Sequence, residues 1–559
     1  MPTTSLEPVL RDLIQKAVKE AGFLPSGEIV PPVGLEIPRI RSHGDMATSV
    51  AMQLASKLRK PPMEIAEAVS SHLRGLLKDS PIQESVERLE TKPPGFINLF
   101  VSRNFLYRVL REVLEQGPEY GRSNIGKGCK ALVEFVSANP TGPLSVAHGR
   151  QAAVGDALAH ILAFTGYRAT REYYLNDEGT QIDLLGESVL ARAKEFLGIS
   201  VQFPENGYKG DYIRSMGEAL AKKVGRTVLE SGKAREVSKK FAAGELGRVI
   251  QGELDRFGVK FGPWFPQSSL NRFGYLTRTL GILKRRGYLY EQEGAWWLKS
   301  TAFGDDKDRV VVRSDGRLTY IAADIAYHRR KFQRGFDLLV NLWGPDHHGY
   351  IARMKAAIQA LGFPPEALEV KIIQLCTLKR GTETIPMSTR EGEFTTLTQV
   401  MDEVGVDAAR FFFLLRKSDA HLEFDLELAK KHSLENPVYY IQYAHARICN
   451  ILENQKKETG ITGLQPDYSK MSSSEELALL RLLREFSGAA EAASRDLEPF
   501  GVISYLQGLA EAFHRFYDVH RVLGQDPALS AARLDLIKGV RTVLATGLRL
   551  LGVSSPEKM

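Results

Sequence analysis

A histidine stands at the head of one predicted helix, directly after a loop that follows a predicted strand. Residues 131–135 (ALVEF) are apolar strand formers, and residues 136–147 contain two prolines and a glycine that forbid regular structure. From His148 to residue 164, apolar side chains recur at helical spacing. This order leaves the first N–H groups of a helix free for a phosphate. His148 could add a hydrogen bond to a phosphoryl group as negative charge develops on it.

A second group of polar residues follows another apolar run. Gly344, Asp346 and His348 come directly after the predicted strand at 336–342. An acid just past a strand of an α/β fold suits a ribose hydroxyl, and a glycine lets a ligand approach the backbone. The adjacent histidines also raise the alternative of a metal site, but an HExxH motif and a third ligand at suitable spacing are both absent. We therefore predict no metal site.

The composition is that of an ordinary globular protein. Of 559 residues, 43% are hydrophobic and 25% charged, and the formal net charge of +7 is compatible with a polyanionic partner without requiring one. Three widely spaced cysteines form no CxxC pair, so we expect a reducing compartment. No apolar run approaches the roughly 18 residues of a membrane span, and the first residues contain no signal-peptide core. We expect a cytoplasmic protein that does not associate with a membrane.

The elements that must position these residues belong to a parallel sheet. Between about 120 and 392, strand-like runs alternate with helical stretches. The predicted strands are 131–135, 169–175, 336–342 and 371–376. Ligands of such a sheet bind at the carboxyl ends of its strands, where the strand order reverses. If the loop at 136–147 is considered by itself, an ordinary strand-to-helix connection without a ligand is as good an interpretation as a phosphate-binding loop.

The flanking regions differ from this pattern. We expect a helix at 6–21, another at 45–59, a third that starts at Pro62, and a strand at 95–102. From about 430 onward the chain is entirely helical, with Asn436 as a predicted N-cap and a capping box formed by Ser473 and Glu476. The predicted helices are 436–452, 474–496, 500–523 and 530–551. The segments are an α+β module (1–115), a Rossmann-type domain (116–392) with a mostly helical insertion (about 178–335), a connection (393–430) and a helical bundle (431–559).

Several of these stretches carry a family resemblance. EFVSANPTGPLSVAHGR (134–150) is similar to the first signature of class I aminoacyl-tRNA synthetases, in particular the arginyl-tRNA synthetases of bacterial type. HGDMATSVAMQLA (43–55) and PGFINLFV (94–101) resemble the added N-terminal domain, which contacts the tRNA elbow in that family. NPVYYIQYAHARI (436–448) and the ending GLRLLGVSSPEKM resemble its anticodon-binding domain. The resemblance extends from about residue 40 to the end of the sequence, and the domains follow one another in the same order as in that family.

The resemblance implies roles for individual residues. A guanidinium is planar, always charged and rich in donors, so a selective pocket needs carboxylates and an aromatic face. Tyr320 and Asp324, four apart, would hold it together with Glu134. The residues implied for arginine are Glu134, Ser137, Asn139, Tyr320, Asp324 and His347; for ATP Pro140, Gly142, His148, Gly149, Gly344, Asp346, His348, Met387 and Ser388; for catalysis His148, Ser145 and Arg390; and for tRNA Asn98, Tyr440 and Arg447.

Two signatures depart from the family pattern. Ser145 and Ala147 replace the first histidine and the glycine of the first signature. In the second signature, Pro386 and Thr389 replace both lysines. Removing a cation from the path of the pyrophosphate can cost orders of magnitude in rate, although many family members lack one or both lysines.

The resemblance implies a two-step reaction. Arginine and Mg-bound ATP would give arginyl-adenylate, and the 3′ end of tRNA for arginine would then accept the arginyl group, with the enzyme acting as a monomer. A first alternative is a tRNA-binding paralogue that has lost catalysis, motivated by the altered signatures. A second is a class I enzyme for another amino acid, which Glu134, Tyr320 and Asp324 argue against.

Overall fold

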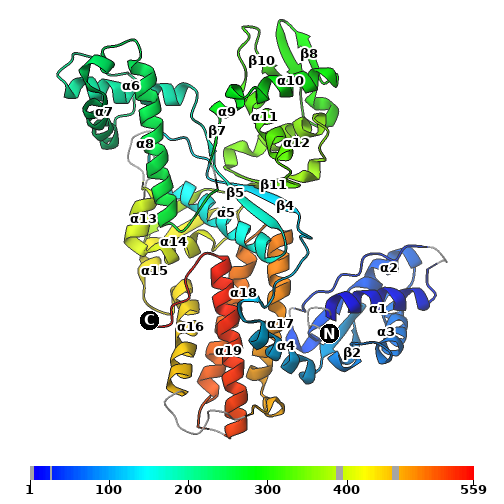
Figure 1. Ribbon diagram of the computed structural model, residues 1–559. Helices are drawn as coiled ribbons and strands as arrows, with labels where there is room; N and C mark the ends of the chain where they lie inside the picture. Colours follow the sequence, from blue (N-terminus) through cyan, green and yellow to red (C-terminus); the bar gives the residue numbers. More distant parts are fainter. Residues whose placement is uncertain are drawn as a thin grey trace.

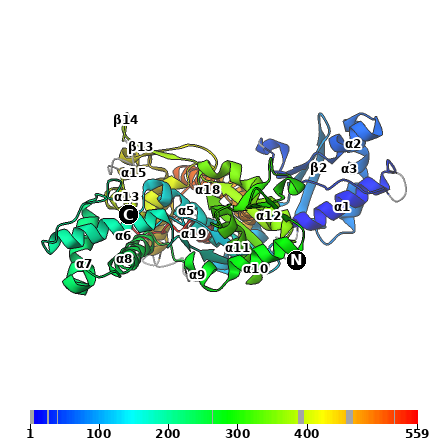
Figure 2. The ribbon, with the colours of Figure 1, turned by 90° about the horizontal axis from the view of Figure 1, so that it is seen from above.

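The computed structural model describes residues 6–24, 28–38, 40–262, 264–385, 395–455, 465–524 and 526–559. Figure 1 shows a central sheet with two lobes above it, a bundle of long helices below it and a separate N-terminal module at one side. Seen from above, the N-terminal module and the lobe formed by residues 180–256 lie at opposite ends of the molecule (Figure 2). No helix in the described ranges is both long enough and apolar enough to cross a membrane.

The N-terminal module is a three-stranded antiparallel sheet with helices packed on it. The strands have the order β1–β3–β2, and α3 packs against both α1 and β2. The elements are α1 (Leu6–Glu20), β1 (Met46–Thr48), α2 (Val50–Leu58), α3 (Pro62–Lys78), β2 (Val86–Lys92) and β3 (Phe96–Val101). The helix predicted at 45–59 was too long, because its first residues pair with β3 as an edge strand. The helix start at Pro62 is confirmed.

Four parallel strands form the central sheet. Their order is β12–β11–β4–β5, and α5 crosses over from β4 to β5. The elements are β4 (Lys130–Glu134), α5 (Val146–Phe164), β5 (Arg168–Glu172), β11 (Leu338–Trp343), α12 (Ile351–Ala360) and β12 (Leu368–Ile372). The chain leaves β4 toward β5 on one side and reaches β11 on the other, so the carboxyl ends of β4 and β11 flank the point where strand order reverses.

The strand predicted at 371–376 proved to be two elements. Its first residues end β12, whereas Cys376 begins β13 (Cys376–Arg380), which belongs to another small sheet. The mostly apolar sequence does not reveal where one strand ends and the next begins, because both have strand-forming residues. β13 pairs with β14 (Glu383–Thr384) and β15 (Leu422–Asp425), next to α13 (Leu397–Val404), α14 (Val406–Phe413) and α15 (Leu426–Lys430).

Two lobes are inserted after β5. The first contains three mutually packed helices, α6 (Thr180–Phe196), α7 (Asp211–Leu229) and α8 (Ala234–Arg256). A short pair of parallel strands, β6 (Tyr174–Leu175) and β7 (Phe265–Pro266), leads to the second. The second lobe contains α9 (Ser268–Arg272), α10 (Tyr275–Arg285), an antiparallel sheet of β8 (Leu289–Gln292), β9 (Ala295–Leu298) and β10 (Arg309–Val312), and α11 (Tyr320–Gln333).

The C-terminal bundle contains α16 (Pro437–Gln455), α17 (Ser474–Arg495), α18 (Phe500–Val519) and α19 (Pro527–Leu550). Asn436 caps α16 through its side-chain oxygen, which accepts from the Val438 N–H at 3.2 Å, and the Ser473–Glu476 capping box is confirmed. α18 ends earlier than predicted, while α19 starts earlier because Asp526 caps it and Pro527 suits its first turn. The preceding α4 (Arg103–Gln116) packs against α17 and α19.

A buried ion pair holds the central domain to the end of the chain. Arg410 of α14 is 1% exposed and its guanidinium lies 2.6 Å from the carboxylate of Asp156 on α5. The same guanidinium donates to the carbonyl oxygens of Phe257 at 2.9 Å and Leu551 at 3.2 Å. One side chain thus joins α5, α8 and the end of α19.

Replacing Arg410 by leucine should destabilise the protein strongly. Asp156 would keep only Arg171, 2.7 Å away, as an arginine partner, and the carbonyl oxygens of Phe257 and Leu551 would lose their donor, which together costs about 3 kcal/mol. Urea unfolding measures the change. The control is Arg515→Leu, since the exposed Arg515 has only a surface pair with Glu511 and its loss should shift the midpoint little. Equal midpoints for both variants would contradict this role of Arg410.

Candidate active site

The loop after β4 holds two residues in an unusual backbone conformation. Val136 and Ser137 have φ values of 66° and 41°, which cost non-glycine residues about 1–3 kcal/mol each. The Ser137 hydroxyl accepts from the Tyr174 N–H at 3.1 Å and donates to Glu134 at 3.3 Å. These two bonds tie the loop to the end of β4 and to Tyr174, and Ser137 lines the same cavity as Trp343 at the end of β11.

His148 lies in the first turn of α5. The Ser145 N–H donates to His148 Nδ1 at 3.1 Å, so Nδ1 is an acceptor and Nε2 carries the ring hydrogen. Burial lowers the pKa of His148 to about 4, so the ring is neutral at pH 7. His148 is therefore a positioned neutral N–H donor near the start of a helix, where the helix dipole also favours an anion.

A cavity of about 500 Å³ opens between this loop, the ends of β4 and β11, α11 and the 3-10 turn Pro345–Tyr350. Its polar lining combines three acids with histidines, tyrosines and amides. The lining residues are Glu134, Val136, Ser137, Ala138, Asn139, His148, Gln151, Tyr174, Asn176, Asp324, Tyr327, His328, Leu342, Trp343, Gly344, Asp346, His347 and Tyr350.

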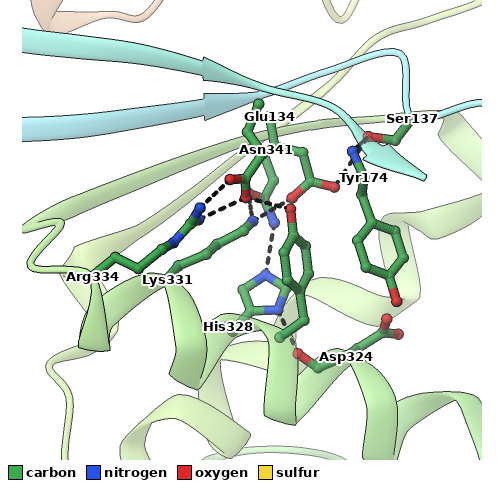
Figure 3. A network of polar contacts seen from close by, with 10 residues as sticks. Glu134, Ser137, Tyr174, Asp324, His328, Lys331, Arg334 and Asn341 are labelled. Atoms are coloured by element: carbon green, nitrogen blue, oxygen red, sulfur yellow. Dashed lines mark hydrogen bonds and ion pairs between the residues drawn. The ribbon is translucent and has the colours of Figure 1, made fainter. Parts of the chain in front are cut away.

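A buried chain of hydrogen bonds runs behind one wall of this cavity (Figure 3). Lys331, fully buried, contacts the Glu134 carboxylate and donates to the Asn341 side-chain oxygen at 3.0 Å. The Asn341 amide lies 2.8 Å from His328 Nε2, and His328 Nδ1 lies 2.7 Å from the Asp324 carbonyl oxygen. Since a carbonyl can only accept, Nδ1 carries the hydrogen and every bond points the same way, from Lys331 toward Asp324. Burial and Lys331 lower the pKa of His328 to about 3, so His328 is neutral.

Asp324 is the carboxylate that this network leaves available. Its side chain accepts from the Tyr350 hydroxyl at 2.6 Å and forms no ion pair with any described residue. Burial, together with the charge of Glu134, raises the pKa of Asp324 to about 6. The Tyr174 hydroxyl and the Asn176 side-chain oxygen are also buried in the cavity wall without a hydrogen-bond partner. A cation with several N–H donors would compensate Asp324 and satisfy such acceptors.

The structure brings many of the predicted residues together. Those that line the cavity are Glu134, Ser137, Asn139, His148, Asp324, Gly344, Asp346 and His347. Ser145, Pro140, Gly142, Gly149 and His348 lie outside its lining, and Gly149 packs against Leu397 and Phe413. Met387, Ser388 and Arg390 lie outside the described residues.

Tyr320 does not line the cavity that Asp324 lines. It is the first residue of α11, it is 74% exposed, and it is not among the cavity-lining residues. Tyr327 of the same helix lines the cavity instead, with its hydroxyl donating to Glu172 at 2.6 Å. The Tyr and Trp residues that line the cavity are Tyr174, Tyr327, Trp343 and Tyr350.

Several site residues had no place in the sequence-based prediction. Tyr327, His328 and Lys331 follow Asp324 by three, four and seven residues, which is the helical spacing that would have placed them on one face. No spacing or motif in the sequence indicated that Tyr350 would belong to the site. In the segment that follows β5, Asn176 lines the cavity, whereas Asp177 accepts from the Ser268 N–H at 2.8 Å and Gln181 accepts from the Asn139 amide at 2.6 Å.

The residues predicted to contact tRNA lie far from this cavity along the chain. Asn98 lies within β3 and is 2% exposed, so it offers little surface to a base in this conformation. Tyr440 lies against His514, with ring centroids 4.5 Å apart. Arg447 lies over the rings of Tyr443 and Tyr517, 4.6 Å from each centroid. Tyr440 and Arg447 therefore belong to a partly exposed aromatic surface on α16 and α18.

Comparison with known proteins decides the family. Three family models match in order: the arginyl tRNA synthetase N terminal domain at 8–101, the class I (R) tRNA synthetase catalytic domain at 109–425 and the DALR anticodon binding domain at 441–559. An arginine–tRNA ligase of Carboxydothermus hydrogenoformans is 47% identical over 98% of this chain and 97% of its own. The chain belongs to the arginyl-tRNA synthetases.

Other relatives agree with this assignment. An arginine–tRNA ligase of Geobacillus thermodenitrificans is 45% identical over 98% of both chains. The solved arginyl-tRNA synthetase of Thermus thermophilus has the same fold, with a TM-score of 0.77, 23% identity and complete coverage of both chains. The class I resemblance seen in the sequence is thereby confirmed for this arginyl-tRNA synthetase.

The raised pKa of Asp324 predicts a pH dependence. As the pH falls through about 6, the carboxylate gains a proton and loses its attraction for a cation. In this arginyl-tRNA synthetase, kcat/KM for arginine should fall about tenfold per pH unit below that value. Asp324→Asn should lower kcat/KM about 100-fold or more and remove this step. A wild-type profile with no step near pH 6 would contradict the prediction.

Because Lys331 and Glu134 form a buried pair, we expect the effects of substituting each of them on the unfolding free energy to depend on one another. Lys331→Met should lower the unfolding free energy by about 3–5 kcal/mol, because it leaves a buried carboxylate unpaired. The double variant Lys331→Met/Glu134→Gln should regain part of that loss. Thermal unfolding of both single variants and the double variant measures the coupling, and strictly additive losses would show that the pair does not interact.

Proposed function

We propose that this arginyl-tRNA synthetase activates arginine with ATP and transfers it to tRNA for arginine. In the first step an oxygen of the arginine carboxylate attacks the α-phosphorus of ATP, and pyrophosphate leaves with its Mg²⁺. In the second step a ribose hydroxyl of the terminal adenosine of the tRNA attacks the carbonyl carbon, and AMP leaves. Mg²⁺ enters as part of the ATP substrate, and no group of three or more potential ligands forms a metal site in the described ranges.

The observation that carries the proposal is the unpaired Asp324 carboxylate opposite a neutral histidine at a helix start. Asp324 suits the guanidinium of arginine, with Glu134 on the same wall. His148, beside the N-terminal end of α5, suits the α-phosphate. Asp346, after β11, suits the ribose of ATP. One cavity thus offers complementary groups for both reactants, which favours their reaction by positioning.

Further details belong to the same proposal. Ser137 and Asn139 would meet the amino and carboxylate groups of arginine, while the exposed side chain of Tyr320 would have to turn toward the cavity to contact the bound arginine. Met387, Ser388 and Arg390 would contact the triphosphate, and Asn98, Tyr440 and Arg447 the tRNA. We further propose that the enzyme acts as a cytoplasmic monomer. The domain bounds at 115, 392 and 430 likewise stay a prediction.

The altered signatures motivated a catalytically inactive tRNA-binding paralogue as the alternative, and the comparisons give it no support. The decisive experiment is ATP–pyrophosphate exchange with arginine, with and without tRNA for arginine. Family members generally need bound tRNA for this step, so exchange should appear only with tRNA. Absence of exchange in both conditions, with tRNA still bound, would support the alternative and contradict the proposal.

Substitution of His148 should affect the chemical step. His148→Ala removes one donor to the developing charge and should lower kcat about 100- to 1000-fold. The KM values for arginine and ATP should change much less. Because the pKa of His148 is about 4, the wild-type rate should show no step from this group between pH 6 and 8. An unchanged kcat for His148→Ala would refute its proposed role.

A further inference from the structure

The last turn of α8 carries a half-buried carboxylate, Glu253, which bonds two other segments of the chain. One oxygen of Glu253 accepts from the Leu144 N–H at 2.9 Å, and the other accepts from the Thr398 hydroxyl at 2.8 Å. The helix α8 starts in the first lobe, and the end that carries Glu253 reaches the central domain beside α13 (Figure 1). Glu253 therefore joins the first lobe to the loop after β4 and to α13.

The surroundings of this carboxylate are unfavourable for a negative charge. Burial raises the pKa of Glu253, and the dipole of α8 repels an anion in the last turn of the helix. Glu253 also forms no ion pair with any described residue, so no cation compensates its charge. A residue that contradicts several local preferences at once is more typical of a functional position than of ordinary packing.

Leu144 is held at both of its backbone polar groups. Its N–H donates to Glu253, and its carbonyl oxygen accepts from the Leu397 N–H at 2.8 Å. Leu397 and Thr398 are the first two residues of α13, so Glu253, Leu144 and α13 form a closed ring of contacts. Leu144 is completely buried, and a Cβ atom at Gly149 would lie only 2.7 Å from the Leu397 side chain. The start of α13 is thus packed tightly against both the loop and the first turn of α5.

This ring lies one residue before the bond that orients His148. Ser145 follows Leu144 directly, and its N–H donates to His148 Nδ1 at 3.1 Å. A shift of Leu144 would displace the Ser145 N–H, and the imidazole of His148 would move with it. A displacement of about 1 Å at a reacting group can cost about 100-fold in rate.

We propose that Glu253 is a positioning residue for the activation step, which holds the loop at Leu144 so that His148 faces the α-phosphate of ATP. The inference rests on the proposed function, which supplies ATP and the role of His148. Glu253 is not among the residues that line the cavity, so it acts through the loop and not on a reactant. Because Glu253 belongs to α8, it also makes the position of the loop depend on the first lobe.

The test measures ATP–pyrophosphate exchange of the full-length protein and its variants in the presence of tRNA for arginine. Glu253→Ala should lower kcat about 10- to 100-fold, while KM for arginine stays unchanged because the Asp324 wall is untouched. Glu253→Gln should retain most of the wild-type kcat. Its oxygen can accept from the Leu144 N–H, and its amide can donate to the Thr398 hydroxyl. An equal loss of kcat in both variants would overturn the inference.

Ser238→Ala is the matched control for stability. Ser238 is fully buried on the same helix and donates to the Gly186 carbonyl oxygen at 2.7 Å, so this variant also loses one buried bond of α8. It should lower the unfolding midpoint and leave kcat unchanged. Thr398→Val removes one of the two bonds of Glu253 while it keeps the shape of the side chain. This variant should lower kcat less than Glu253→Ala, and it tests the inference even where Glu253→Ala does not fold.

A double variant with His148 separates positioning from a general loss of stability. If Glu253 acts through His148, Glu253→Ala/His148→Ala should be no slower than His148→Ala, whereas independent effects would multiply. An unchanged kcat in Glu253→Ala, or multiplied effects in the double variant, would overturn the inference while exchange by the wild type still supports the proposed function. Absence of exchange in the wild type would overturn both.

Discussion

The contact between Lys331 and Glu134 is the constraint on which the site depends. It joins α11 to β4, and the bond from Lys331 to Asn341 also joins α11 to β11. β4 and β11 are the two strands that flank the point where strand order reverses. Because Lys331 is completely buried, its charge needs a partner, and Glu134 needs Lys331 for the same reason. The pair therefore ties α11 of the inserted lobe to the central sheet.

The same network has a consequence for charge. Lys331 offsets Glu134, and the neutral His328 passes the hydrogen-bond chain on to the backbone of Asp324 without adding a charge. The Asp324 carboxylate is left with a phenol as its partner and no described cation. The free site thus lacks one positive charge, which the side chain of arginine would supply in the proposed binding mode. Selectivity for a cationic amino acid would then come from this uncompensated negative charge of the folded protein.

Much of this arrangement could be predicted from the sequence, for physical reasons that differ between parts. The strand–loop–helix unit around His148 was predictable because prolines and glycine exclude regular structure between two periodic segments. The bundle helices were predictable from their period and caps. The edge strand at Met46–Thr48 was not, because pairing with β3 overrides local helix propensity. Lys331 was missed because a basic residue on a helix is usually exposed, and only the tertiary structure shows that this one is buried. The position of Tyr320 depended on the helix start, where a predicted face is least well defined.

In the proposed binding mode the guanidinium of arginine lies between Glu134 and Asp324, with its charge balanced by the latter. A crystal structure of the protein with bound arginine tests this most directly. We expect guanidinium nitrogens within hydrogen-bond distance of the Asp324 carboxylate, with Lys331 still in contact with Glu134. A structure in which the guanidinium points away from Asp324, or in which Lys331 has left Glu134 to make room for it, would contradict this binding mode.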